Sequence, residues 1–336
     1  RAEGEGGTPP AFPHTGDVAS GFLVPLRRRC ELEARGHDSR SIKRALTNGG
    51  LVLLRRGVYA RTSELSDLTA EDRAVIRARA YALIAAVPPV FAGRTAAALH
   101  GLPLLVDDEK VHVLSSEGRP SSGYGIVRHR GDLREGDVTR IRGLRCTSLA
   151  RTVVDLARWD SREAGVSAAD AALRRVAFTP PGAYDEDAAS TFREVMIRMV
   201  RNTSHGHAKA HRAVRFSDGR AAGPGESVSR LRLDELGFEA PALQVPVEGP
   251  SGTTLFMDFG LEEADAWGEF DGKIKYRGLA TAAGRTPQEV VEREKQREDW
   301  IRGTTRRRVV RWGWDDIRDA ATLGRRLAAF GVRPRG

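Results

Sequence analysis

Residues 266–276 read AWGEFDGKIKY, and this stretch decides how the C-terminal part of the chain is interpreted. Two acids and two lysines occupy its alternate positions: Glu269, Asp271, Lys273 and Lys275. In a β-strand, side chains two residues apart point to the same side, so these four would share one face. Such a face is either a solvated edge of a sheet or a functional site.

The elements around this stretch predict an α/β domain. Residues 226–238 have the apolar spacing of a helix, and the strands are expected at residues 242–247, 253–261, 266–276 and 306–312. Thr286 and Glu289 form a capping box with Pro287 at the first helical position, which predicts a helix ending near Arg302. The order helix, three strands, helix, strand, helix is typical of an α/β domain.

Asp258 lies in the middle of the apolar segment LFMDFG, residues 255–260. A carboxylate there is costly unless it is paired or binds a metal, and the acids of the next strand would repel it. A divalent cation such as Mg²⁺ or Mn²⁺ resolves this conflict, because it takes oxygen ligands and lets phosphate oxygens complete its shell. It also lowers the pKa of a bound water, which Lys273 could orient while stabilising developing charge.

Residues 226–318 resemble the PD-(D/E)XK nuclease superfamily, in particular its branch similar to very-short-patch repair endonucleases. The resemblance is carried, in order, by PGESVSRLRL, QVPV, FMDFG, GEFDGK and EKQREDWIR…RRVVRWGW. It implies a restriction-endonuclease-like α/β domain with Mg²⁺ or Mn²⁺ as cofactor. The implied catalytic residues are Asp258, Glu269, Asp271 and Lys273. The implied metal ligands are Glu226, Asp258, Glu269 and Asp271.

The register of this motif stays open. Asp271-Gly272-Lys273 matches an acid-x-lysine motif, whereas E-x-D-G relatives would make Glu269 the metal ligand and Asp271 its companion. The branch often has a histidine after the glycine, where this chain has Lys273 and Lys275. The identity of the general base is therefore open as well.

The charge distribution indicates a polyanionic partner. The 336-residue chain has 54 Lys and Arg against 45 Asp and Glu, a net charge of +9. Residues 21–60 alone contain nine basic and three acidic residues, a local net charge of +6. This density is typical of a nucleic-acid-binding surface, and a general arginine bias of the genome is the alternative.

Residues 22–60 predict a winged helix-turn-helix. A helix is expected at residues 39–49 with Ser39 as N-cap, followed by a hairpin of residues 51–54 and 57–60. In such a motif the second helix enters the major groove of DNA and the hairpin tip contacts the backbone. The expected DNA contacts are Arg40, Lys43, Arg44, Arg55 and Arg56. A helix followed by a hairpin with no nucleic-acid role would look similar.

The N-terminal half also resembles the AbiEi-type antitoxin domain of type IV toxin–antitoxin systems. The matching segments are LLRRGVYA (53–60), AGRTAAALHGL (92–102), VHVLSS (111–116) and RCTSLARTVVDLAR (145–158). This resemblance implies a DNA-binding regulator with a cognate toxin as a possible partner.

The expected organisation is an α/β multi-domain chain. It comprises a disordered tail (1–18), a winged helix-turn-helix (19–66), a mixed α/β domain (67–160), a helical linker (161–222) and a nuclease-like domain (223–336).

Cys30 and Cys146 have neither disulfide-framework nor zinc-finger spacing, which indicates a reducing cytoplasm. No apolar run approaches the ~18 residues of a membrane span. His207 and His211 are four residues apart, but without a third ligand a solvated polar stretch is the preferred interpretation.

Two functional hypotheses follow. The first is a DNA-tethered, metal-dependent endonuclease. The second is a non-catalytic DNA-binding regulator or antitoxin whose rear domain is a degenerate nuclease fold. The sequence does not indicate the DNA sequence recognised or the oligomeric state.

Overall fold

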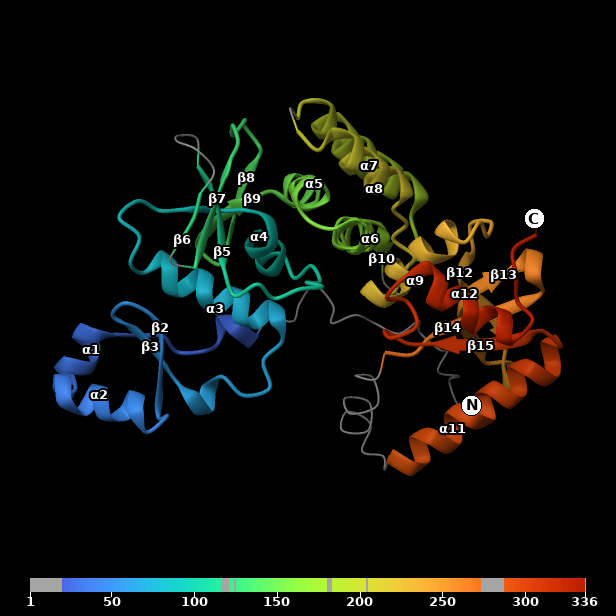
Figure 1. Cartoon of the computed structure of the whole chain (residues 1–336), viewed down its shortest axis with the longest axis horizontal. Coiled ribbons are helices and arrows are strands. Elements are labelled where there is room, and N and C mark those ends of the chain that lie inside the picture. The colour runs from blue at the N-terminus through green and yellow to red at the C-terminus, as the bar shows by residue number, and fades with distance from the viewer. Residues whose placement is uncertain are drawn as a thin grey trace, which may run out of the picture. The chain divides into compact units, whose positions relative to one another are not determined.

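The structure, a computed structural model, describes residues 20–115, 121–123, 125–179, 183–203, 205–272 and 287–335. The chain divides into two compact units, each coloured by position along the chain in Figure 1. Of the described residues, the N-terminal unit comprises those within 20–172 and 190–217, and the C-terminal unit comprises those within 173–189 and 218–335. The expectation of a mixed α/β chain is confirmed, because sheets and helices occur in both units.

The first part of the N-terminal unit is a pair of helices followed by a hairpin. Its helices are η1 (Ser20–Phe22), α1 (Arg29–Ala34), α2 (Ser39–Thr47) and η2 (Thr62–Glu64), and its sheet, in the order β1-β3-β2, contains β1 (Arg27–Arg28), β2 (Leu51–Arg55) and β3 (Val58–Arg61). Leu32, Ile42 and Tyr59 form the small core between the helices and the sheet. The N-cap of α2 is Asp38 rather than the expected Ser39, because the Asp38 carboxylate accepts a hydrogen bond from the Ser41 amide (2.7 Å).

The second part of the N-terminal unit is a six-stranded mixed sheet in the order β6-β7-β5-β4-β9-β8. Its strands are β4 (Val90–Phe91), β5 (Val111–Ser115), β6 (Ser121–Gly123), β7 (Ile126–Arg130), β8 (Val138–Ile141) and β9 (Leu144–Thr147), and its helices are α3 (Ala70–Ala82), α4 (Gly93–Leu99) and α5 (Leu149–Trp159). The expected cap of α3 is confirmed by the reciprocal bonds of Thr69 and Asp72. Val75, Phe91 and Val111 are fully buried where α3 packs on the sheet.

Three helices occupy residues 161–222, the segment predicted to be a helical linker. They are α6 (Arg162–Ala177), α7 (Glu186–Arg201) and α8 (His207–Phe216), with a ribbon of β10 (Phe178–Thr179) and β11 (Ala183–Tyr184) between the first two. Both α6 and α7 contribute residues to each unit. Buried residues such as Leu173, Met196 and Val214 show that these helices are packed elements.

The C-terminal unit contains a four-stranded sheet in the order β12-β13-β14-β15. Its strands are β12 (Ala242–Glu248), β13 (Thr254–Leu261), β14 (Ala266–Phe270) and β15 (Arg308–Trp312), and its helices are α9 (Pro224–Glu235), η3 (Pro250–Gly252), η4 (Glu262–Ala264), α11 (Pro287–Thr305) and α12 (Ala320–Ala329). The first three strands are antiparallel neighbours, whereas β15 pairs with β14 in parallel. A parallel pair needs a crossover connection, and α11 lies in it.

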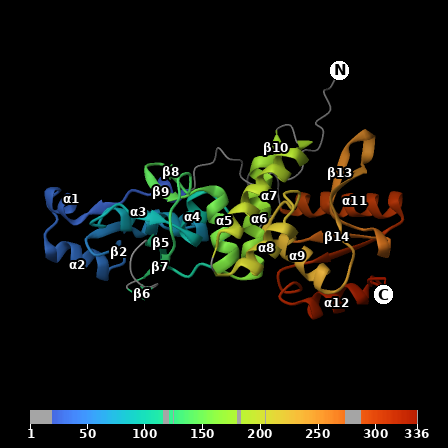
Figure 2. The same ribbon diagram turned by 90° about the horizontal axis from the view of Figure 1, so that it is seen from above.

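Helices cover both faces of this sheet, as Figure 2 shows for α11 and α12. On the α11 face, Ile301 packs against Met257 and Trp267. On the other face, the Trp312 indole donates a hydrogen bond to the hydroxyl of Ser229 in α9 (2.8 Å). The expected strand at residues 266–276 is shorter than predicted, since β14 ends at Phe270. None of the helices in the described part of the chain has the length and apolar character needed to cross a membrane.

Candidate functional site

The strand β14 is an interior strand and not a solvated edge. All five of its residues are buried, and it pairs with β13 on one side and β15 on the other. Gly268 is required here because a Cβ at this position would overlap the indole of Trp312. Of the two interpretations of the charged face, the solvated edge is therefore wrong for Glu269.

Asp258 is joined directly to the end of β14. Its Oδ2 accepts a hydrogen bond from the backbone amide of Phe270 (2.8 Å), so the carboxylate lies at the residue between Glu269 and Asp271. The neighbouring side chains show why it can reach there. Met257 joins the cluster on the α11 face, whereas Phe259 stacks on Trp312 of the opposite face. Residues two apart share a face in a regular strand, so these contacts depart from the regular alternation around Asp258.

Gln244 and Glu226 extend this group of polar side chains. Gln244 stands opposite Asp258 in the β12–β13 pair and has a positive φ of 49°, which is uncommon for a residue other than glycine. Its side-chain amide nitrogen lies 3.1 Å from Glu226 Oε2 and 3.4 Å from Asp258 Oδ1. Glu226, in the first turn of α9, is 3% exposed and also accepts a hydrogen bond from the Ala222 amide (2.7 Å). Two predicted metal ligands thus share one amide donor.

Glu269 is held by two guanidinium groups. Arg297 of α11 lies 2.7 Å from its Oε1, and Arg311 of β15 lies 2.8 Å from its Oε2. Burial raises the pKa of the Glu269 carboxyl, and the nearby Asp258 adds to this rise, whereas the two arginines oppose it. The carboxylate therefore has cationic partners supplied by the chain itself.

Asp271 follows β14 directly, and its amide donates to the carbonyl of Trp312 (2.8 Å). This bond continues the β14–β15 pairing by one residue. The predicted catalytic Lys273, like Lys275, lies outside the residues that the structure describes. The structure therefore describes only Asp271 and Gly272 of the acid-x-lysine motif.

The described carboxylates do not form a full protein cage for a metal ion. In the described part of the chain, no three His, Cys, Asp or Glu side chains are grouped so that they could hold a metal ion. Mg²⁺ is usually bound through one or two carboxylates, with waters and substrate phosphates completing its shell. Asp258, bonded to the strand end between Glu269 and Asp271, provides such a carboxylate.

Helix α2 presents the predicted DNA-binding cations to solvent. Arg40, Lys43 and Arg44 are exposed, while Ile42 faces the core. Within the described ranges, none of these three cations forms an ion pair with an acid. Spaced three and four residues apart, they lie on neighbouring positions of one helical face.

The two arginines predicted at the hairpin tip have different environments. Arg56 is exposed in the turn between β2 and β3. Arg55 is half-buried, and its guanidinium donates to the carbonyl of Gly125 (2.8 Å), beside β7. Burial lowers the pKa of Arg55. The structure therefore places Arg55 in a contact between two parts of the N-terminal unit rather than at a free tip.

The pair His207 and His211 also differs from a metal site. Their rings stack with centroids 5.9 Å apart, and Arg215 donates to His211 Nε2 (3.3 Å). A guanidinium donor on this nitrogen competes with a metal for its lone pair. The interpretation as a polar, non-metal stretch is consistent with this geometry.

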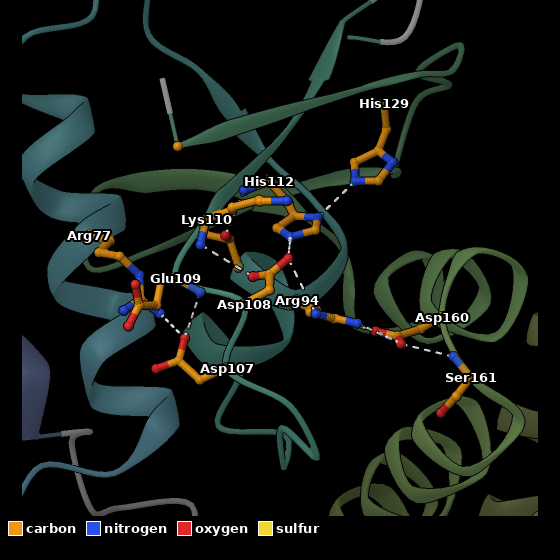
Figure 3. A network of polar contacts seen from close by, with 12 residues as sticks. Arg77, Arg94, Asp107, Asp108, Glu109, Lys110, His112, His129, Asp160 and Ser161 are labelled. Carbon is orange, nitrogen blue, oxygen red and sulfur yellow. Dashed lines mark hydrogen bonds and ion pairs between the residues drawn. The ribbon is translucent and has the colours of Figure 1, made fainter. Parts of the chain in front are cut away.

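A partly buried polar network in the N-terminal unit was not predicted (Figure 3). Arg94 pairs with Asp160 (Nη2 to Oδ1, 2.8 Å) and with Asp108 (3.2 Å), and Asp108 also contacts His112 Nε2 (2.9 Å). His112 Nδ1 in turn lies 2.8 Å from Nε2 of His129. The sequence signal for it was weak: single histidines within the apolar strands VHV and IVRHR.

The network ends in an aromatic stack. The ring of His129 lies parallel to the indole of Trp159, with centroids 3.9 Å apart and an interplanar angle of 2°. Burial, together with the neighbouring His112, lowers the pKa of His129 to about 4. Both histidines are thus neutral near pH 7, since burial lowers the pKa of His112 as well.

Comparison with known proteins finds relatives in Mycobacterium tuberculosis. No family model matches it. It is 30% identical over 295 residues to uncharacterized protein MT2308 of Mycobacterium tuberculosis (strain CDC 1551 / Oshkosh), covering 84% of this chain and 92% of that protein. The same values hold for uncharacterized protein Rv2248 of strain ATCC 25618 / H37Rv. Because the similarity spans nearly the whole length of both relatives, the chain belongs to the family that these two mycobacterial proteins represent.

Proposed function

We propose that this protein binds DNA through its N-terminal unit and hydrolyses phosphodiester bonds with its C-terminal unit, using Mg²⁺ or Mn²⁺. The observation that carries the proposal is the bond from the Phe270 amide to Asp258 Oδ2, which brings an acid of β13 to the acids of residues 269–271. The order and directions of the four strands, with helices on both faces, are compatible with the PD-(D/E)XK nuclease domain that the sequence resembles.

Within this site, the favoured metal ligands are Asp258 and Asp271. Glu269 has two arginine partners, which suit it to joining α11 and β15 more than to holding a cation. Glu226 positions Asp258 through the shared amide of Gln244. When bound, the cation would lower the pKa of a water and offset charge on the phosphate, and Lys273 is proposed to stabilise that charge.

The N-terminal unit is proposed to act as a winged helix-turn-helix. Helix α2 would enter the major groove with Arg40, Lys43 and Arg44, and the β2–β3 turn would contact the backbone with Arg56. The exposed, unpaired cations of α2 among the described residues support this role, because such side chains can neutralise phosphates without breaking an internal ion pair. The free thiols of Cys30 and Cys146 suit a reducing cytoplasm.

A second candidate function is a non-catalytic regulator or antitoxin of a type IV toxin–antitoxin system, with a cognate toxin as partner. The arginine pairs of Glu269 favour it, because they offset a buried carboxylate without any metal. In that case the C-terminal unit would serve binding or assembly.

Incubation of supercoiled plasmid with the full chain in Mg²⁺ or Mn²⁺ tests these alternatives. The proposal expects nicking or cutting that EDTA and Asp258→Asn abolish, while Glu262→Gln, at an exposed acid of the same unit, retains it. A protein that shifts duplex DNA in gels but never cleaves it in either metal would exclude the enzyme and leave the regulator.

A further inference from the structure

Gln244 has a strained backbone within a regular strand. Its φ is +49°, whereas its neighbours Leu243 and Val245 keep the pairing of β12 with β13. A left-handed backbone costs free energy at most residues other than glycine, and such residues cluster at active sites and ligand-binding segments. The strain indicates that the side chain of Gln244, which a glycine would lack, contributes something that this site needs.

The two ends of the Gln244 amide have different surroundings. Nε2 lies 3.1 Å from Glu226 Oε2 and 3.4 Å from Asp258 Oδ1, so one NH₂ group serves two carboxylates. Oε1 is buried, and no hydrogen-bond donor of the described residues reaches it. A buried carbonyl oxygen without a donor is costly. The amide thus satisfies its acidic neighbours while its own oxygen stays unsatisfied.

The same amide can present either of its ends to the carboxylates. The last torsion of a glutamine side chain is soft and roughly two-fold, so half a turn exchanges Nε2 and Oε1 without moving the backbone. After this turn, three side chains would direct oxygen atoms at one another: Glu226, Asp258 and Gln244. Such an arrangement is repulsive by itself and becomes favourable around a cation.

A neutral amide oxygen suits the cation of the proposed hydrolysis. Mg²⁺ and Mn²⁺ prefer carboxylate, carbonyl and water oxygens. No three His, Cys, Asp or Glu side chains of the described ranges form a metal-binding group, so a third protein ligand there would have to be of another type. Glutamine is such a type, and Gln244 already contacts two of the predicted ligands.

We infer that Gln244 is a ligand of the divalent cation: when the ion binds, the amide turns and Oε1 replaces Nε2 beside Asp258. This inference rests on the function proposed above and adds a neutral oxygen to its cation site. Without the ion, the NH₂ group bridges the carboxylates of Glu226 and Asp258. Gln244 is therefore a hydrogen-bond donor in one state and a metal ligand in the other.

Binding of Mn²⁺ to the full chain without DNA tests this assignment, with the electron paramagnetic resonance signal of free Mn²⁺ as the readout. Gln244→Met keeps the length of the side chain but has no hard oxygen, so the Kd for Mn²⁺ should rise at least about tenfold. Gln244→Glu keeps the oxygen and adds a charge, so the Kd should fall. If Gln244 only donated hydrogen bonds, methionine would instead leave Mn²⁺ binding unchanged or strengthen it, because an unbridged pair of acids attracts the ion more strongly.

Two further variants keep the test independent of folding. Gln288→Glu is the matched control, since Gln288 is exposed on α11 of the same unit and should leave the Kd unchanged. Gln244→Gly adopts the left-handed backbone without strain and should raise the Kd as methionine does. Thermal unfolding adds a second readout: Gln244→Glu should unfold below the wild type in EDTA and recover in Mn²⁺, because three carboxylates repel until the ion binds.

The outcomes separate this assignment from the proposed hydrolysis. If Gln244→Met and Gln244→Gly bind Mn²⁺ as tightly as the wild type, the assignment is overturned even when plasmid is cleaved. Equal weakening by methionine and glutamate, or a wild type that binds no Mn²⁺, overturns it as well. If the variants shift Mn²⁺ binding as expected while the wild type never cleaves DNA in Mg²⁺ or Mn²⁺, the ligand stands and the hydrolysis falls.

Discussion

Asp258 and Phe270 are linked by a hydrogen bond of 2.8 Å from the backbone amide of Phe270 to Asp258 Oδ2. The bond joins β13 to the end of β14, at a point where Met257 and Phe259, on either side of Asp258, pack in different clusters. It places an acid from one strand beside the acids that end the next strand. The proposed chemistry of the C-terminal unit depends on this relationship.

Asp258→Asn should therefore remove cleavage without removing DNA binding. The amide keeps an oxygen for the Phe270 bond but loses the charge needed to hold a divalent cation, which contributes several kcal/mol to the reaction. We expect the nicking rate to fall by at least about a hundredfold, with an unchanged gel-shift affinity. Equal nicking rates for the variant and the wild type would remove Asp258 from the site.

Substitutions at Glu269 and Asp271 distinguish the two registers of the motif. Glu269→Gln removes the buried carboxylate that joins Arg297 of α11 to Arg311 of β15, so the free energy of unfolding should fall by about 3 kcal/mol. Asp271→Asn should reduce cleavage strongly with little effect on stability. Urea unfolding measures the first effect and plasmid nicking the second.

The control for Glu269 is Glu262, which pairs with Arg307 at the surface and is 57% exposed. Glu262→Gln should cost less than about 1 kcal/mol. If Glu269→Gln is as stable as the wild type but cannot cleave DNA, Glu269 is the metal ligand and the favoured register is wrong.

The arginines and lysine of α2 should determine the salt dependence of DNA binding. Each of Arg40→Ala, Lys43→Ala and Arg44→Ala should reduce the slope of log affinity against log salt concentration by about 0.9 if the side chain contacts one phosphate. Arg55→Ala serves as the contrast, because Arg55 bonds to Gly125 and should affect stability but not the slope. A slope that none of the α2 substitutions changes would exclude this helix as the DNA-binding element.

His129 should make the protein less stable in mild acid. Its pKa of about 4 lies below the 6.5 of an exposed histidine, so the unfolded chain binds more protons between these values. The stability contributed by neutral His129 is complete above about pH 6.5 and is lost as the pH falls toward 4.

Urea unfolding between pH 7.5 and 4.5 measures this effect. His129→Asn should show a weaker loss of stability over this range than the wild type, whereas His37→Gln, in an exposed loop, should follow the wild type. Identical pH profiles for His129→Asn and the wild type would contradict the lowered pKa of the partly buried His129.

Local patterns in the sequence were sufficient to predict several of the helices and strands. The strands at 242–247 and 253–261, the hairpin after α2 and the capped helix at Thr69 follow from alternation, turn residues and capping, which act over a few residues. Such local patterns do not predict where a strand ends, or which partner a side chain has, when this depends on residues distant in the sequence. The strand predicted to reach Tyr276 ends at Phe270, and the side chain of Arg55, beside the hairpin turn, bonds to the carbonyl of Gly125 seventy positions away.

The sequence by itself determined that acids lie on neighbouring strands and that cations gather near the N-terminus, because residue types and their spacing are local properties. Only the tertiary structure decided which of these charges meet. Three contacts join residues through strand pairing and helix packing: the pairing of Glu269 with Arg297 and Arg311, the bond from Phe270 to Asp258, and the Asp108–His112–His129 network. Those contacts arise from side chains competing for the same buried space and hydrogen-bond partners, and no spacing along one segment encodes that competition.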